Sequence, residues 1–123
     1  MNLEQLGSEV EAVSRMYASR HGIERSPEWL VLKLHEEVGE LTQAFLMKTG
    51  QARAKGKSES ELEASLEAEL ADVLAQALLI GQHFGIDVQQ AVERKWLVWN
   101  PDRQRQRAGS HAAVAAEEGS GGS

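Results

Sequence analysis

The stretch "LHEEVGELTQAF", residues 34–45, decides the fold, because it sets glutamates beside the apolar stripe of a helix. The stripe repeats at three- and four-residue intervals, which is typical of an amphipathic helix. Its members are Leu34, Val38, Leu41 and Phe45. Glu37 and Glu40 share a neighbouring face, about 100° around the axis from that stripe. Carboxylates at the border of a core must reach water or a cation, or they cost free energy.

Four helices are predicted from the capping and terminating residues around this stretch. They are expected from residue 2 to 21, from Ser26-Pro27 to Gly50, from Ser58 to Gly85, and from Asp87 to just before Asn100-Pro101. No segment alternates with the period of a strand, so the predicted class is all-α, with a four-helix bundle-type subunit. Residues 1–107 are expected to form one domain, and residues 108–123 a flexible Gly/Ser/Ala-rich tail outside the fold.

Composition excludes several classes of protein. The chain has 123 residues, a formal net charge of −6 and no cysteine. A net negative charge disfavours binding to nucleic-acid polymers, which requires a basic surface. The absence of cysteine rules out disulfides and thiolate metal sites and fits a cytoplasmic protein. No apolar run reaches the roughly 18 residues needed to cross a bilayer, so membrane insertion is not expected.

A second acidic pair, Glu69 and Asp72 in "ELAD", repeats the three-residue spacing in the next apolar helix. If the two helices pack through their stripes, four carboxylates converge, and their charge must be compensated. A divalent cation does so most directly, and all-oxygen ligation favours Mg²⁺ or Mn²⁺. The simpler interpretation, glutamates along a solvated helix edge, stays open on spacing alone. A di-iron site is disfavoured because none of the four histidines lies three residues after a glutamate.

The motifs resemble those of a known family. "EEVGE" at 36–40 is followed after 28 residues by "ELAD" at 69–72, and then by "ERKWLVWN" at 93–100. This ExxE…ExxD pattern is similar to that of the MazG-like all-α nucleoside triphosphate pyrophosphohydrolases, over roughly residues 25–102. The resemblance implies that Glu37, Glu40, Glu69 and Asp72 bind Mg²⁺. It implies cleavage of a (d)NTP between the α- and β-phosphates, giving the monophosphate and pyrophosphate, in nucleotide-pool cleansing.

The resemblance also suggests roles for residues outside the four acids. Glu36 is a candidate for an outer ligand or the base that orients water, against a solvated role. Lys95 and Asn100 are expected to contact phosphate or sugar, and Lys33 and Lys48 are weaker candidates. Trp29, Trp96 and Trp99 are either core residues or surfaces on which a base stacks.

Assembly and substrate remain less defined. The helix from Ser58 to Gly85 is apolar on more than one face, and relatives assemble as dimers or dimers of dimers, so a homodimer or homotetramer is expected. The base preference is not fixed by any motif. Two alternatives stay open: a phosphoribosyl-ATP pyrophosphohydrolase-like enzyme, and a non-catalytic helical dimer that acts as an antitoxin-like interaction module.

Overall fold

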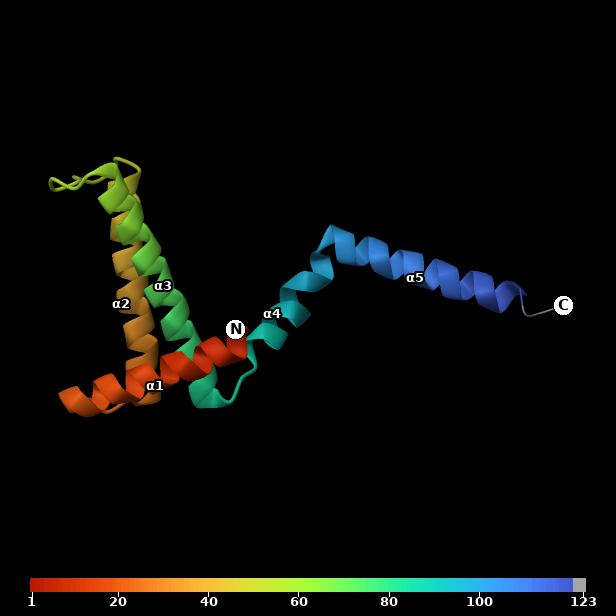
Figure 1. The fold of residues 1–123 in the computed structure, drawn as a ribbon, viewed down its shortest axis with the longest axis horizontal. Coiled ribbons are helices and arrows are strands. Elements are labelled where there is room, and N and C mark those ends of the chain that lie inside the picture. Colours follow the sequence, from red (N-terminus) through yellow and green to blue (C-terminus); the bar gives the residue numbers. More distant parts are fainter. Residues whose placement is uncertain (121–123) are drawn as a thin grey trace. The chain divides into compact units, whose positions relative to one another are not determined.

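The computed structural model describes the backbone of residues 1–120 and the side chains of residues 1–110, and over that backbone it contains helices and no strand (Figure 1). The all-α prediction is confirmed. The elements are α1 (Leu3–His21), α2 (Pro27–Lys48), α3 (Glu59–Phe84), α4 (Val88–Trp96), a 3₁₀ turn η1 (Leu97–Trp99) and α5 (Pro101–Ser120). None of the helices in the described part is long and apolar enough to cross a membrane. The chain divides into two compact units, Met1–Ile86 and Asp87–Ser123.

The helix ends follow the predicted capping residues. The Ser26 hydroxyl accepts a hydrogen bond from the backbone of Trp29 at 3.1 Å, and Pro27 occupies the first turn of α2. Ser58 caps α3 and Asp87 caps α4 in the same way. Gly85 ends α3 with φ near +64°, a left-handed conformation that favours glycine. Asn2 likewise caps α1 by accepting from the backbone of Gln5, so the four predicted starts are confirmed.

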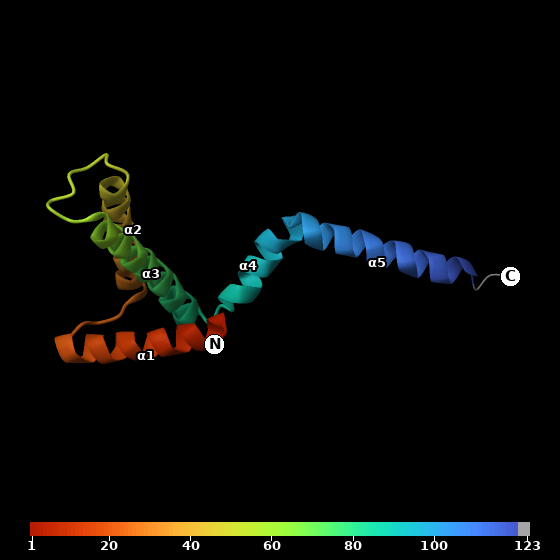
Figure 2. The same cartoon turned by 45° about the horizontal axis from the view of Figure 1, so that its top comes forward.

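In the first unit, α2 and α3 lie side by side as a hairpin joined by residues 49–58, and α1 crosses α3 (Figures 1 and 2). Gly7 of α1 makes the crossing close. A Cβ at this position would come within 3.1 Å of the Gln82 side chain and 4.0 Å of Leu78 on α3. A side chain at position 7 would therefore require the Gln82 amide to shift by a few tenths of an ångström.

The buried core of the described residues is small. Its apolar members are Ala18, Leu30, Ala44, Leu62, Leu78 and Leu79. The sequence predicted that the apolar stripes are buried, and within a single chain this prediction was wrong for three residues. Val38, Phe45 and Leu70 are 42%, 47% and 58% exposed. The reason is geometric: a hairpin crossed by one helix covers one side of each helix and leaves the others open.

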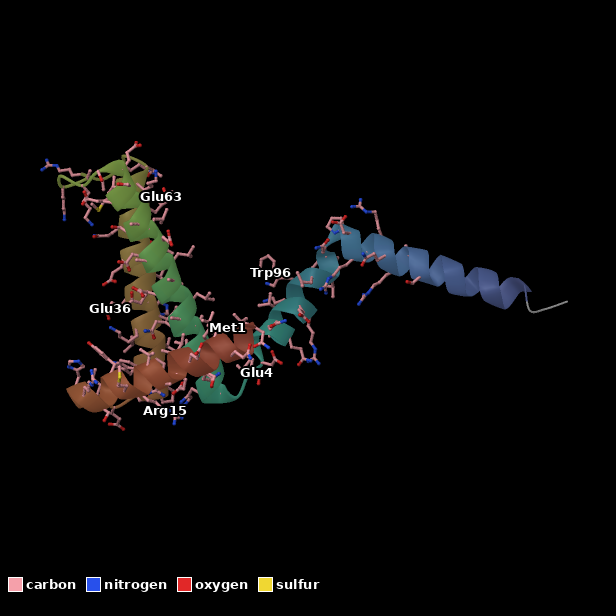
Figure 3. The ribbon with its side chains drawn as sticks, viewed as in Figure 1. Met1, Glu4, Arg15, Glu36, Glu63 and Trp96 are labelled. Atoms are coloured by element: carbon pink, nitrogen blue, oxygen red, sulfur yellow. The ribbon has the colours of Figure 1, made fainter. Side chains whose placement is uncertain are left out.

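The second unit corrects the expected helix count. Four helices were predicted and the described chain contains five, because α5 extends through residues expected to belong to a flexible tail. Residues 121–123 of that tail lie outside the described residues. The first unit contains three helices, so a four-helix bundle-type subunit stays a prediction. Trp96 on α4 (Figure 3) is 69% exposed and Trp99 on η1 is 75% exposed, so the core interpretation of these two residues was wrong for the isolated chain.

Candidate metal centre

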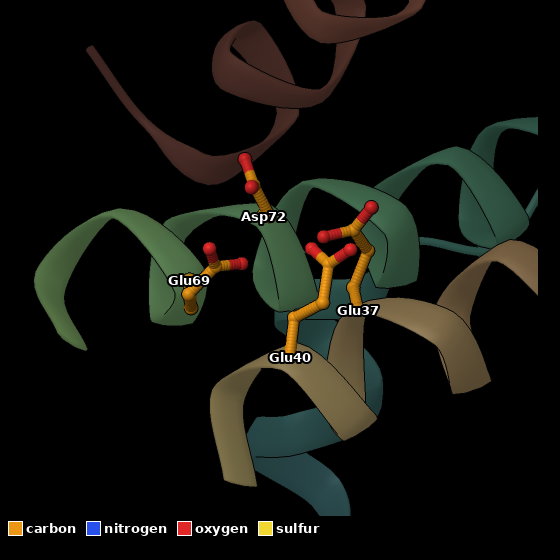
Figure 4. Close-up of side chains that lie close together, drawn as sticks. All are labelled: Glu37, Glu40, Glu69 and Asp72. Carbon is orange, nitrogen blue, oxygen red and sulfur yellow. The ribbon is translucent and has the colours of Figure 1, made fainter. Parts of the chain in front are cut away.

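Four carboxylates converge on the inner side of the α2–α3 hairpin. Glu37 and Glu40 project from α2, and Glu69 and Asp72 project from α3, toward a common region (Figure 4). Each side chain offers one oxygen, and these four oxygens all lie within 4.8 Å of one another. The structure therefore brings together the four acids that the sequence singled out.

The position of Glu37 in α2 explains why it faces α3. Leu30 and Ala44, seven residues before and seven after it, are only 1% and 6% exposed. Residues seven apart lie almost on one line along a helix, so Glu37 occupies the middle of the buried line. The sequence analysis placed it at the border of a stripe through Val38. The helix is instead rotated so that Glu37 turns inward and Val38 outward.

Glu69 occupies the corresponding position in α3. Leu62, seven residues earlier, is 7% exposed, and Gln76, seven residues later, is partly buried. The Gln76 amide oxygen is buried without a hydrogen-bond partner in the described structure. Gln76 was not predicted from the sequence to belong to the site. It lies seven residues after Glu69 and four after Asp72, and this helical spacing could have indicated that it shares their face.

The electrostatics of the cluster are unfavourable without a counter-charge. Glu37 and Glu69 are partly buried, and one oxygen of each is buried with no hydrogen-bond partner. Burial raises the pKa of Glu37 to about 7, assisted by a hydrogen bond with Glu40 and by the charges of Glu40 and Asp72. Burial and the same two neighbours also raise the pKa of Glu69. A group with such a pKa is poised to exchange its proton for a cation.

The donor set fits a divalent cation. Carboxylate oxygens are the ligands that hard cations prefer, and a site with no nitrogen or sulfur donor disfavours zinc. The four oxygens lie within 4.8 Å of one another, so these residues would hold the cation through carboxylate oxygens from both helices. Within the four acids, the buried oxygens of Glu37 and Glu69 have no hydrogen-bond partner in the described structure, so they are free to bind a cation.

Lys33 and Glu36 lie beside the cluster on α2. The Lys33 ammonium donates to a Glu36 carboxylate oxygen at 3.1 Å. This hydrogen bond is the main cause that raises the pKa of Lys33, and the charge of Glu37 contributes in the same direction. Glu36 is exposed and is not among the four converging acids (Figure 3). Lys33 is therefore close to the centre, and Glu36 flanks it.

The other residues predicted to bind substrate have separate surroundings. Lys48 pairs with Glu63 of α3 at 3.2 Å, near the loop end of the hairpin. The Asn100 side chain accepts a hydrogen bond from the backbone of Asp102 and so caps α5. Lys95 is exposed on α4, and Trp29 is partly buried at the start of α2. Their roles toward a substrate stay predictions.

An all-helical unit with carboxylates paired at three-residue spacing on two packed helices defines a class of proteins suited to hold a divalent cation and, through it, phosphate groups. The comparison with known families agrees. Residues 25–96 match the family model described as the MazG nucleotide pyrophosphohydrolase domain. The chain therefore belongs to the MazG family of nucleotide pyrophosphohydrolases, as the sequence motifs predicted. No curated protein matches the chain.

Proposed function

We propose that the protein is a Mg²⁺-dependent nucleoside triphosphate pyrophosphohydrolase that cleaves a (d)NTP between the α- and β-phosphates. The observation that carries the proposal is the convergence of Glu37, Glu40, Glu69 and Asp72 within 4.8 Å, in a chain of this family. The products are the nucleoside monophosphate and pyrophosphate, and removal of unwanted nucleotides from the pool is the role that fits this reaction.

The four acids would hold the cation, with Mn²⁺ as a possible substitute for Mg²⁺. A bound divalent cation supplies charge neutralisation and polarises the phosphoryl oxygens of the triphosphate. Glu37 and Glu69 contribute the buried oxygens, while Glu40 and Asp72 are exposed to solvent. Water adds to one phosphorus of the α–β anhydride, and the bridging oxygen departs with the other phosphate.

Glu36 and Lys33 are proposed to act next to this centre. An exposed carboxylate beside the cluster can accept the proton that the attacking water loses. The ammonium of Lys33 lies 3.1 Å from a Glu36 carboxylate oxygen and can turn to donate to a phosphate oxygen. Lys95 and Asn100 are proposed to contact phosphate or sugar, Lys48 is a weaker candidate for the same contacts, and Trp29 is a candidate for contact with the base.

A nucleotide panel tests the proposal. The protein is incubated with natural and modified NTPs and dNTPs with Mg²⁺, and pyrophosphate and monophosphate are measured. We expect Glu40→Gln and Asp72→Asn to lower kcat by about 100-fold or more. Glu67→Gln, which removes an exposed acid of α3 outside the cluster, is the matched control and should retain activity. Absence of pyrophosphate with every nucleotide, or equal rates for all three variants, would overturn the assignment.

The active form is proposed to be a homodimer or homotetramer. Support comes from the small core and from large apolar side chains left open on the hairpin, such as Phe45, Leu70 and Leu74. Exposed apolar surface of this kind is typical of a face that a second subunit covers.

A further inference from the structure

The loop that joins α2 to α3 turns sharply just before α3 begins. The backbone of Lys57 donates a hydrogen bond to the carbonyl oxygen of Ala54 at 3.1 Å, which closes a tight turn. Its two central residues, Lys55 and Gly56, have φ angles of +53° and +80°, as in a type I′ turn. Ser58 then caps α3. The position of Lys57 is therefore fixed on both sides, by the turn before it and by the helix after it.

The Lys57 ammonium lies about one helical turn from the carboxylate centre. It donates a hydrogen bond to the Ser65 hydroxyl at 3.3 Å. Ser65 is four residues before Glu69, so the two side chains share one face of α3. Burial raises the pKa of Glu69, and the charge of Lys57 acts on the same carboxyl in the opposite direction. Among residues 1–110 no ion pair involves Lys57, so its charge is available to an anion at the centre.

Lys33 and Lys57 flank the centre at its two ends along the hairpin. The helices α2 and α3 run in opposite directions (Figure 1), so the turn before Glu37 and the turn before Glu69 lie on opposite sides of the four acids. Lys33 belongs to the first of these turns, and Ser65, which Lys57 contacts, belongs to the second. A chain of phosphates held by a cation between the helices could therefore reach an ammonium group at each end.

We propose that Lys57 binds the β- and γ-phosphates of the nucleotide, and then the pyrophosphate product, which deepens the function proposed above and rests on it. The two terminal phosphates carry most of the negative charge of a triphosphate. Residues 49–57 include three bases, Arg53, Lys55 and Lys57, and no acid, whereas Lys33 at the other end is paired with a carboxylate of α2. The terminal phosphates therefore lie toward the loop, where an ammonium group can donate to their oxygens.

Isothermal titration calorimetry with inorganic pyrophosphate measures this contact without hydrolysis. The full chain is titrated in Mg²⁺, and the same titration in EDTA is the blank. We expect cation-dependent binding whose Kd rises about tenfold in Lys57→Gln. Lys57→Arg, which keeps a positive charge of similar reach, should restore most of the affinity.

Lys55→Gln is the matched control for the titration. It removes the same charge from the same loop, and in the described structure no hydrogen bond or ion pair joins Lys55 to α3. Its Kd for pyrophosphate should change by about twofold at most. Equal weakening by Lys55→Gln and Lys57→Gln would show a general effect of charge and would overturn the proposal, as would an absence of Mg²⁺-dependent pyrophosphate binding.

Product inhibition places the contact along the nucleotide. In Lys57→Gln, inhibition of hydrolysis by pyrophosphate should weaken about tenfold, whereas inhibition by the monophosphate product should change by about twofold at most. A larger effect on the monophosphate would put Lys57 at the wrong end of the substrate. If pyrophosphate binding depends on Lys57 but no nucleotide is hydrolysed, the proposed function fails while this contact stands. If nucleotides are hydrolysed but Lys57→Gln binds pyrophosphate normally, the contact alone fails.

Discussion

Glu37 on α2 and Glu69 on α3 occupy equivalent positions, each seven residues after a buried leucine, Leu30 in one helix and Leu62 in the other. On the buried side of each helix, therefore, one position holds a carboxylate where packing alone would favour an apolar residue. Each places one oxygen out of reach of water and of any hydrogen-bond donor in the described structure. Burial therefore disfavours the ionised form of both carboxylates and raises their pKa.

Removing the charge of Glu37 should stabilise the metal-free protein. Glu37→Gln keeps the shape of the side chain and ends its repulsion with Glu40 and Asp72, so we expect the melting temperature in EDTA at pH 8 to rise by about 3 to 8 °C, corresponding to about 1 kcal/mol. The same variant should lose most of the stabilisation that Mg²⁺ or Mn²⁺ gives the unmodified protein. Glu67→Gln is the control for a general change in net charge. A lower melting temperature for Glu37→Gln than for this control would contradict the prediction.

The stability of the metal-free protein should fall as the pH rises from about 4.5 to 7. The pKa of Glu37 is raised from 4.5 to about 7, so the folded state binds more protons than the unfolded chain over that interval, and Glu69 shifts in the same direction. Allowing for screening by solvent, we expect a loss of about 1 to 2 kcal/mol, measured by urea unfolding in EDTA. The slope should largely vanish in Glu37→Gln. A stability that rises steadily over this range would be inconsistent with the buried carboxylates.

Cation binding should release protons at mildly acidic pH. At pH 6.5 a group with a pKa near 7 is mostly protonated, so binding of Mn²⁺ should release at least about half a proton per site. At pH 8.5 the release should be close to zero. Titration calorimetry in buffers of different ionisation enthalpy measures this number directly. Release of the same number of protons at both pH values would show that the cation does not displace a proton from Glu37.

The contact between Glu11 and Arg25 should stabilise the first unit. Arg25 donates to Glu11 from the segment that leads into α2, and Arg15 donates to the same oxygen at 3.0 Å. Burial alone would raise the pKa of Glu11, but the two arginines outweigh it and lower that pKa. Glu11→Ala leaves Arg25 partly buried without its partner and should cost about 1 to 3 kcal/mol of unfolding free energy.

The matched control for this contact is Arg15→Ala, because the Arg15 side chain is 75% exposed and its removal should cost less than about 0.5 kcal/mol. Since the pKa of Glu11 is lowered, its contribution is present above pH 4.5 and is lost as the pH falls below that value. Equal destabilisation by the two alanine variants would argue against a special role for Arg25.

Charges on the open apolar face of α3 should prevent self-association. Leu70 and Leu74 lie one turn apart and are 58% and 47% exposed. We expect light scattering to show a dimer or tetramer for the unmodified protein and a monomer for Leu70→Glu/Leu74→Glu. Ala64→Glu places the same charge on another exposed face of α3 and should leave the assembly intact. A monomeric unmodified protein with full activity would rule out the proposed assembly.

The helix boundaries could be read from local signals because capping is decided within a few residues. Ser26 with Pro27, Ser58, Asp87 and Gly85 each act through hydrogen bonds or backbone conformations that need no distant partner. The fifth helix was missed because its small residues and glycines gave no apolar periodicity, the signal on which the expectation depended. The two acid pairs were found for the same local reason, a three-residue spacing within one helix.

The sequence by itself determined the starts of α1 to α4 and the pairing of Glu37 with Glu40 and of Glu69 with Asp72, because each depends on contacts within one or two turns. Only the tertiary structure decided how far each helix is rotated in the hairpin. That rotation turns Val38 outward and Glu37 inward, since Leu30 and Ala44 lie on the line of α2 that is buried, and α2 packs mainly against α3. It is this choice between neighbouring faces, invisible to periodicity alone, that brings four carboxylates to one point.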